Sequence, residues 1–178
     1  NKELFSRGNT KRSIVKLDYN NFLTRKLQLN TIIEFENTIA EGNNISEAQR
    51  NIFTSVISLN HQLTKKLSYG VQFRKDFLKD FNAPFLYSLG IDYQFNNKYQ
   101  LSFNTSKNFR IPTFNDLYWQ PGGNPNLEPE DSYQFEIGNK LQLKNTAIQV
   151  NTFFIKTSNL IQWTPNRNGI WSPINVNE

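Results

Sequence analysis

The chain has 178 residues, 14% of them aromatic, and carries a formal net charge of +5 from 20 basic and 15 acidic residues. The basic residues are scattered, and the densest groups, Lys11-Arg12 and Lys65-Lys66, are too short for the basic stripe of a nucleic-acid-binding face. We therefore predict no nucleic-acid partner. No run of about 18 apolar residues is present, which excludes a membrane-spanning helix. The absence of cysteine excludes disulfides and thiolate metal sites.

The length fits one domain or a portion of a larger one. The sequence contains no methionine, and no signal peptide is recognisable at its start. We therefore expect an excised or processed portion of a longer protein.

Apolar and polar side chains alternate with a period of two in segment after segment, which is the pattern of a strand with two different faces. In chain order the predicted strands lie within 15–19, 27–36, 53–59, 67–74, 85–95, 99–104, 133–138 and 148–154. The clearest is 85–95, where every odd position from Phe85 to Phe95 is apolar or aromatic. No segment shows a helical period. The sequence predicts an all-β antiparallel meander with up-and-down connections.

Short and long connections alternate between these strands. The connections at 20–25, 62–66, 96–97 and 139–145 are short, whereas those at 38–49, 75–83, 108–129 and 157–172 are longer. Outer-membrane barrels have short periplasmic turns and longer external loops. Several strands reach about ten residues, enough for a tilted strand to cross the hydrocarbon layer. Tyr19, Tyr69, Tyr93 and Tyr99 near strand ends suit an interfacial girdle. Together these features favour a segment of a transmembrane β-barrel over a soluble β-sandwich.

The number of strands limits the kind of barrel. At roughly 20 residues for a strand and its connection, the chain supplies about eight or nine strands. Eight strands can close into a small, passive outer-membrane barrel. However, residues 171–178 begin like a further strand and stop. Three architectures therefore stay open: a portion of a larger barrel, a small closed barrel, and a soluble β-sandwich that serves as a binding module.

Residues 108–130 contain a strand that ends in Phe109-Arg110, the turn Pro112-Thr113-Phe114, and the loop Asn124-Pro125-Asn126-Leu127-Glu128-Pro129-Glu130. In this order the three features resemble TonB-dependent outer-membrane receptors. The later runs 159–163 and 171–176 look like the vitamin B12 (cobalamin) receptor branch of this family. Siderophore receptors have similar stretches there, so both ligand classes stay open.

The resemblance implies a parent barrel of 22 strands, closed by an N-terminal plug, in the outer membrane of a Gram-negative cell. Such a receptor is surrounded by outer-membrane lipid and takes up a scarce, large ligand such as cobalamin or an iron chelate. Energy reaches it through the TonB protein, which contacts a segment before the plug. On this reading residues 1–178 belong to the C-terminal half of the barrel, and the plug and its TonB contact are absent. The resemblance implies no cofactor.

Aromatic residues in the long connections are the candidate ligand contacts. Trp119, Trp163 and Trp171 lie in or beside predicted loops, and with Phe114 and Tyr118 they offer an apolar external face for a large flat ligand. Asn124 and Asn126 add polar groups to the same region. The alternative is an interfacial belt or packing of loop on loop. Asn124, Asn126, Glu128, Glu130 and Asp131 carry oxygen atoms, but their spacing does not match a calcium loop, and we predict no metal.

The family motif also supplies residues for the inner face of the barrel. It comprises Phe109, Arg110, Pro112, Asn124, Pro125, Leu127, Pro129 and Glu130. The alternation predicts that Arg110 points inward, on the same side as Glu130, Gln134 and Glu136 of the next strand. These charges either pair with one another, hold a plug, or are simply solvated. The lone His61 lies at a predicted turn without a nucleophile pattern, so we predict no enzymatic activity.

Overall fold

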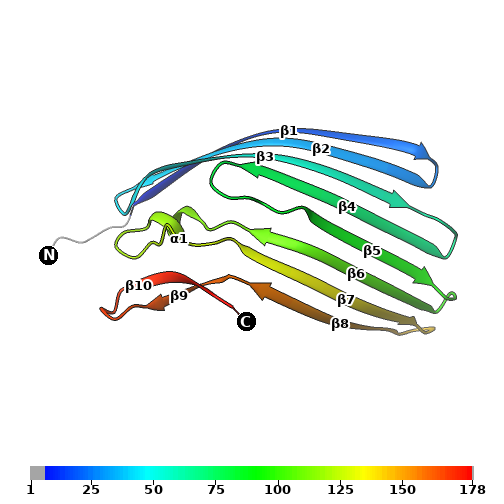
Figure 1. Cartoon of the computed structure of the whole chain (residues 1–178). Helices are drawn as coiled ribbons and strands as arrows, with labels where there is room; N and C mark the ends of the chain where they lie inside the picture. Colours follow the sequence, from blue (N-terminus) through cyan, green and yellow to red (C-terminus); the bar gives the residue numbers. More distant parts are fainter. Residues whose placement is uncertain (1–6, 178) are drawn as a thin grey trace.

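The structure is a computed structural model that describes residues 7–177. Eight strands form one antiparallel sheet in chain order (Figure 1). A short helix lies between the sixth and seventh strands, and a separate two-stranded hairpin follows the eighth. The elements are β1 (Gly8–Thr24), β2 (Leu27–Gly42), β3 (Ile45–His61), β4 (Leu67–Leu78), β5 (Leu86–Gln94), β6 (Tyr99–Arg110), α1 (Phe114–Tyr118), β7 (Glu130–Gln142), β8 (Ala147–Ser158), β9 (Leu160–Pro165) and β10 (Trp171–Val176). The predicted all-β antiparallel meander is confirmed.

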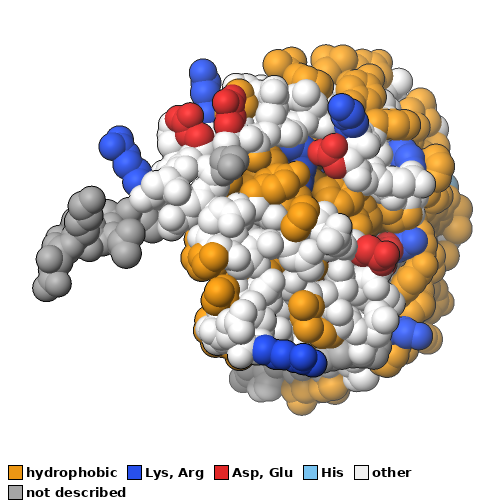
Figure 2. Space-filling model, turned by 60° about the vertical axis from the view of Figure 1, so that its left-hand side comes forward, with side chains coloured by type: hydrophobic (Ala, Val, Ile, Leu, Met, Phe, Trp, Pro, Cys, Tyr) orange, Lys and Arg blue, Asp and Glu red, His pale blue; other side chains and the backbone are white. Residues whose placement is uncertain are grey.

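The strand register gives the curved sheet two chemically different faces. Paired neighbours in one row across the sheet are apolar almost throughout: Leu29, Leu59, Val71, Leu89, Thr105, Phe135 and Phe154. The adjacent row on the other face is polar: Asn30, Ser58, Gln72, Ser88, Ser106 and Gln134. The polar row lines a concave hollow of about 620 Å³. Figure 2 shows hydrophobic side chains gathered along the outer edge of the molecule.

No element within residues 7–177 covers the apolar outer face. Among residues 7–177 the buried apolar side chains are few, including Val56, Leu117 and Leu127, whereas outer-face residues such as Val15 and Phe73 are 73% and 54% exposed. An exposed apolar surface of this extent marks a contact with a partner or a membrane. The single layer of strands also differs from a β-sandwich, which buries its apolar faces between two sheets.

The sheet is open in the described part of the chain. β1 and β8 form its two edges, and no pairing joins them. A closed eight-stranded barrel would require these edges to pair. The two-stranded hairpin of β9 and β10 is a sheet of its own. The prediction that 171–178 begins a further strand is therefore right for β10, but β10 pairs with β9 and not with the main sheet.

Two predictions about the connections are wrong, those for 38–49 and 157–172, because residues 160–165 within the second form β9. Residues 38–49 are not a long loop, because β2 and β3 stay paired from Thr38–Arg50 to Ala40–Ala48 and join through 43–44. Its side chains are largely polar on both faces, so its sequence lacks the alternation that marks the other strands. The segment 111–129 contains the one-turn helix α1, which is too short to show a helical period in the sequence. No helix within residues 7–177 has the length and apolar character needed to cross a membrane.

The connections separate into two ends. The turns 25–26, 62–66, 95–98 and 143–146 lie at one end, on the right of Figure 1, and we call this the turn end. The connections 43–44, 79–85 and 111–129 lie at the opposite end together with the β9–β10 hairpin, and we call this the loop end. β1 and β3 each have 17 residues, whereas β4 and β6 have 12, so the first strands project further at the loop end.

Candidate functional site

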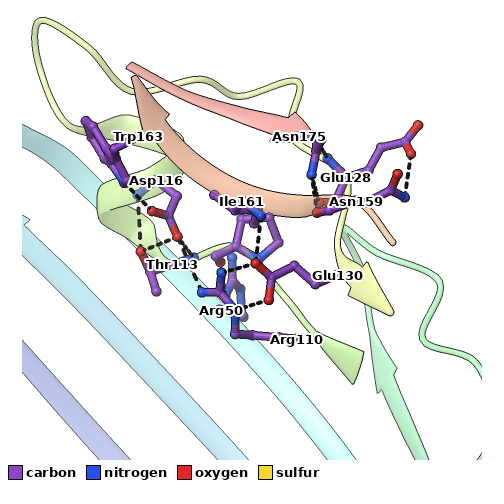
Figure 3. A network of polar contacts seen from close by, with 11 residues as sticks. Arg50, Arg110, Thr113, Asp116, Glu128, Glu130, Asn159, Ile161, Trp163 and Asn175 are labelled. Atoms are coloured by element: carbon purple, nitrogen blue, oxygen red, sulfur yellow. Dashed lines mark hydrogen bonds and ion pairs between the residues drawn. The ribbon is translucent and has the colours of Figure 1, made fainter. Parts of the chain in front are cut away.

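The long connection between β6 and β7 folds over the loop end and contacts elements on both sides. The backbone N–H of Gln120 donates to the carbonyl oxygen of Asn44 at 2.7 Å, which ties the connection to the tip of the β2–β3 hairpin. On its other side the connection meets the β9–β10 hairpin through the polar network of Figure 3. These contacts hold the longest loop in one shape, although Pro and Gly interrupt its sequence.

Thr113 and Asp116 begin this network by capping α1. The Thr113 hydroxyl accepts from the Asp116 backbone N–H at 3.1 Å. In return Asp116 Oδ2 accepts from both the backbone N–H and the hydroxyl of Thr113, each at 2.8 Å. This reciprocal arrangement is a capping box, which satisfies backbone donors at the start of a helix. It makes a single helical turn stable where the sequence has no amphipathic pattern.

Asp116 also reaches the β9–β10 hairpin. Its Oδ1 accepts from Trp163 Nε1 at 3.0 Å, and the Trp163 ring meets the Trp119 ring edge-on at a centroid distance of 5.7 Å. Burial of Asp116 opposes its ionisation, but the hydrogen bonds from Thr113 and Trp163 and the nearby Arg110 guanidinium outweigh this effect and lower the pKa of its carboxyl. Asp116 is therefore a buried carboxylate that links helix, loop and hairpin.

Arg110 and Glu130 form the base of the network. They are register partners at the ends of β6 and β7, and two guanidinium nitrogens of Arg110 donate to the two carboxylate oxygens of Glu130. Glu130 Oε1 also accepts from the backbone N–H of Ile161 in β9 at 2.7 Å. The prediction that Arg110 points to the same side as Glu130, Gln134 and Glu136 is confirmed by the register.

A second set of contacts joins the end of the loop to the hairpin. The side-chain amide of Asn175 on β10 forms two hydrogen bonds with the backbone of Glu128. Its Oδ1 accepts from the Glu128 N–H and its Nδ2 donates to the Glu128 carbonyl, each at 2.8 Å. Asn124 Nδ2 donates to the carbonyl of Pro173 at 3.1 Å. At Gly122 the backbone approaches so closely that an added Cβ would lie 1.9 Å from the carbonyl oxygen of Trp171.

Arg50 supports the loop from beneath. It extends from β3, and one of its terminal nitrogens donates to the carbonyl of Pro112 at 2.9 Å. Its guanidinium lies over the rings of Phe114 and Phe81, at 4.8 Å and 5.6 Å from their centroids. Such cation–π contacts strengthen when the cation is withdrawn from water. Arg50 thus joins α1, the β4–β5 connection and β3.

The sequence of residues 4–178 matches the family model described as "TonB dependent receptor-like, beta-barrel". The chain belongs to this family. The arrangement above is therefore the loop end of a TonB-dependent receptor β-barrel, with the polar face turned to the inside of the curve and the apolar face to the outside.

Several known proteins are similar to this TonB-dependent receptor segment in sequence or in fold. The vitamin B12 transporter BtuB of Photobacterium profundum is 35% identical over 96 residues, which are 52% of this chain and 16% of that protein. The siderophore receptor PirA of Pseudomonas aeruginosa has a TM-score of 0.81 at 16% identity, over 97% of this chain and 35% of PirA. The hemophore receptor HasR of Serratia marcescens, solved with its hemophore HasA and heme, has a TM-score of 0.72 at 14% identity, over 96% of this chain and 37% of HasR. The chain thus spans only part of the length of these relatives.

The structure brings the predicted aromatic contacts of this receptor segment together in two pairs. Phe114 and Tyr118 stack along α1 with ring centroids 6.3 Å apart, and Trp119 meets Trp163 as described above. Trp171 is 56% exposed at the start of β10. Asn124 and Asn126 shape the loop, because the Asn126 N–H donates to Asn124 Oδ1 at 3.0 Å. Loop packing accounts for the positions of Trp119 and Trp163, and it leaves Trp171 and Tyr118 facing solvent.

The other motif residues shape the same loop. Pro112 and Leu127 are buried beneath it, Pro125 is exposed, and Phe109 and Pro129 are half-buried. No group of three or more His, Asp or Glu side chains within residues 7–177 is arranged to hold a metal ion.

The sequence did not predict the residues that join the loop to the hairpin. The motif includes Thr113, but no pattern predicted a role for Asp116, Arg50 or Asn175. The spacing of Thr113 and Asp116 is a capping-box signature and could have been found. The remaining contacts join segments far apart in the sequence, such as Asn175 and Glu128, which are 47 residues apart. No local pattern indicates contacts of this kind.

Proposed function

We propose that this chain is part of the barrel wall of an outer-membrane receptor that takes up a corrinoid such as cobalamin in a TonB-dependent way. The observation that carries the proposal is the curved sheet with an uncovered apolar outer face and a polar inner face, capped at one end by an ordered loop cluster. In a lipid bilayer this outer face meets hydrocarbon. The identity with a vitamin B12 transporter supports the ligand.

Candidate ligand contacts lie at the loop end. Trp171 is 56% exposed, and Tyr118 of α1 is 37% exposed. Aromatic side chains contribute large contact areas with a polar edge, which suits a large flat ligand such as a corrin ring. The network around Asp116 and Glu130 holds the segments that carry them in fixed positions. Phe114, Trp119, Trp163, Asn124 and Asn126 act on this site mainly by positioning the loop.

The second candidate ligand is an iron chelate. Its support is the fold shared with the siderophore receptor PirA and with the hemophore receptor HasR. The polar inner face then surrounds the plug of the complete receptor, and the TonB protein acts through a segment before that plug. Both ligand classes are large and scarce, so both require an external site that binds before energy is supplied.

Equilibrium binding by the complete natural protein, purified in detergent, tests the ligand. We expect cyanocobalamin to bind, and a ferric catecholate siderophore and heme to bind at least about 100-fold more weakly. Trp171→Ala should weaken cyanocobalamin binding by about tenfold, because an exposed aromatic contact is lost. The matched control is Phe22→Ala, which removes a side chain 71% exposed at the turn end and should leave binding unchanged. Binding of the siderophore or heme in place of cyanocobalamin would show that the corrinoid proposal is wrong.

A further inference from the structure

Basic residues occupy all four short turns at the turn end. The turns carry Arg25 and Lys26, Lys65 and Lys66, Lys98, and Lys144, and we call these six residues the basic rim. All six are exposed. The turn segments 25–26, 62–66, 95–98 and 143–146 contain no acidic residue. In the part of the chain that the structure describes, none of the six side chains forms an ion pair.

Three of these lysines hold equivalent positions in successive hairpins. Lys26, Lys66 and Lys98 each precede the first residue of the following strand, β2, β4 and β6. The carbonyl of each accepts a hydrogen bond from the next turn or strand end: from Gln62 at 2.8 Å, from Gln94 at 2.7 Å and from Gln142 at 2.6 Å. These backbone bonds hold neighbouring turns side by side. The charges therefore form one continuous row along the edge of the curved sheet and not four separate patches.

An aromatic belt lies directly beside this row on the outer face. His61 and Tyr69 meet edge-on at 5.3 Å between ring centroids, Tyr93 and Phe95 at 4.6 Å, and Phe95 and Tyr99 approach at 5.2 Å. Tyrosine at such a position marks the level of the lipid headgroups, where one side of the ring is apolar and the other is wet. The basic rim then lies at or just beyond the level of the phosphate groups.

We propose that the basic rim docks on anionic phospholipid headgroups of the periplasmic leaflet, with phosphatidylglycerol as the model ligand. The inference rests on the proposed outer-membrane location and goes beyond the uptake of a ligand. A lipid is favoured over an acidic protein because the basic row continues directly into the aromatic belt on the outer face. The opposite end lacks this arrangement, because its loops mix basic residues such as Lys79 and Arg167 with acidic ones such as Asp80 and Glu128.

Native mass spectrometry of the complete natural protein in a non-ionic detergent tests this surface. The protein is titrated with short-chain phosphatidylglycerol, phosphatidylcholine and glycerol 3-phosphate at low salt. The turn variant replaces one residue in each turn, Lys26→Gln, Lys65→Gln, Lys98→Gln and Lys144→Gln. The matched control neutralises four exposed basic residues toward the other end of the strands, Arg7→Gln, Lys11→Gln, Lys79→Gln and Arg167→Gln.

We expect the natural protein to bind phosphatidylglycerol at least about tenfold more tightly than phosphatidylcholine, since each basic residue near an anionic surface contributes on the order of fivefold. The turn variant should lose this preference, and the control should keep it. The inference is wrong if the natural protein binds both lipids equally, which would leave an acidic protein as the partner of the rim. It is also wrong if the control loses the preference as fully as the turn variant, or if glycerol 3-phosphate binds as tightly as the lipid.

Cyanocobalamin binding to the same samples separates this inference from the proposed function. Both variants should bind cyanocobalamin like the natural protein, because none of the substituted residues belongs to the loop network. A protein that prefers phosphatidylglycerol but does not bind cyanocobalamin overturns the ligand proposal and supports the lipid surface. A protein that binds cyanocobalamin but shows no lipid preference supports the ligand proposal and overturns the lipid surface.

Discussion

Arg110 and Glu130 are register partners across β6 and β7, and they form a bidentate ion pair. Arg110 is the last residue before the long connection, and Glu130 is the first residue after it. Because Glu130 also accepts the backbone N–H of Ile161, one carboxylate joins both ends of the loop to the β9–β10 hairpin. Bidentate pairs between guanidinium and carboxylate groups fix orientation as well as contributing energy. The position of the hairpin at the loop end therefore depends on this pair.

Glu130→Gln should loosen the hairpin without unfolding the sheet. The variant removes a charge-assisted acceptor from Ile161 and weakens the pair with a half-exposed Arg110, a loss of about 1 kcal/mol. Hydrogen exchange at the Ile161 amide should then become about fivefold faster. Glu36→Gln is the matched control, because Glu36 pairs with Arg12 at 2.6 Å on the same face and far from the hairpin. Equal exchange at Ile161 in Glu130→Gln and the natural protein would contradict the bridging role of Glu130.

The docking of the hairpin should also depend on pH through Asp116. The folded loop lowers the pKa of this carboxyl below its ordinary value of about 3.9, so its stabilising effect is complete above that value and is lost as the pH falls through the folded pKa. Docking should be unchanged from pH 7 to about pH 4 and weaken below it. Fluorescence of Trp163 in a variant with Trp119→Phe and Trp171→Phe reports the change.

Two variants identify the group that titrates. Asp116→Asn removes the carboxyl that accepts from Trp163, so the acid-induced fluorescence change should shrink to the part that comes from Glu130, whose pKa is also lowered by the hydrogen bond from Arg110. Asp80→Asn removes an exposed carboxyl of the β4–β5 connection and should keep the transition of the natural protein. A transition of the same size in Asp116→Asn as in the natural protein would assign the pH dependence to Glu130 and not to Asp116.

Gly122 has a packing role that can be tested without changing charge. An added Cβ at this position would lie 1.9 Å from the Trp171 carbonyl oxygen, a backbone atom that cannot move independently of β10. Gly122→Ala should therefore displace the hairpin at a cost of about 2 kcal/mol, seen as faster proteolysis within 166–170. In Gly8→Ala the added Cβ would meet its nearest atom at 4.0 Å, so this control should be cleaved like the natural protein. Equal cleavage of the two variants would show that the hairpin tolerates a Cβ at Gly122.

The two faces of the sheet could be predicted from the sequence because alternation is a local property of each strand. Residues 85–95 show it directly, and the register then aligns the same faces of all eight strands. The paired stretch at 38–49 could not be predicted, since its side chains are largely polar on both faces. Its pairing continues from Phe35 and Phe53, which lie in the predicted strands, and depends on the partner strand and not on its own composition.

Within the candidate site, alternation predicted the side on which Arg110 and Glu130 lie but left open whether they pair. The register places the two residues opposite each other at the ends of β6 and β7. The bond between Trp163 and Asp116 joins residues 47 positions apart, and it exists because the β9–β10 hairpin turns away from the sheet edge. The sequence predicted loops for both segments but not their contact.

The outer face provides the most direct test of the proposed membrane location. Phe135 and Gln134 are neighbours on β7 that face opposite sides, with Phe135 in the apolar row beside Phe154 and Gln134 in the polar row beside Ser106. A lysine near the middle of the lipid-facing surface costs about 2–4 kcal/mol, whereas one facing the lumen costs little. In the complete natural protein reconstituted in vesicles, Phe135→Lys should therefore lower the free energy of unfolding in denaturant by about this amount, and Gln134→Lys should leave it nearly unchanged. If Gln134→Lys were the more destabilising change, the apolar face would not be the side that meets lipid, because hydrocarbon penalises a charge far more than an aqueous lumen does.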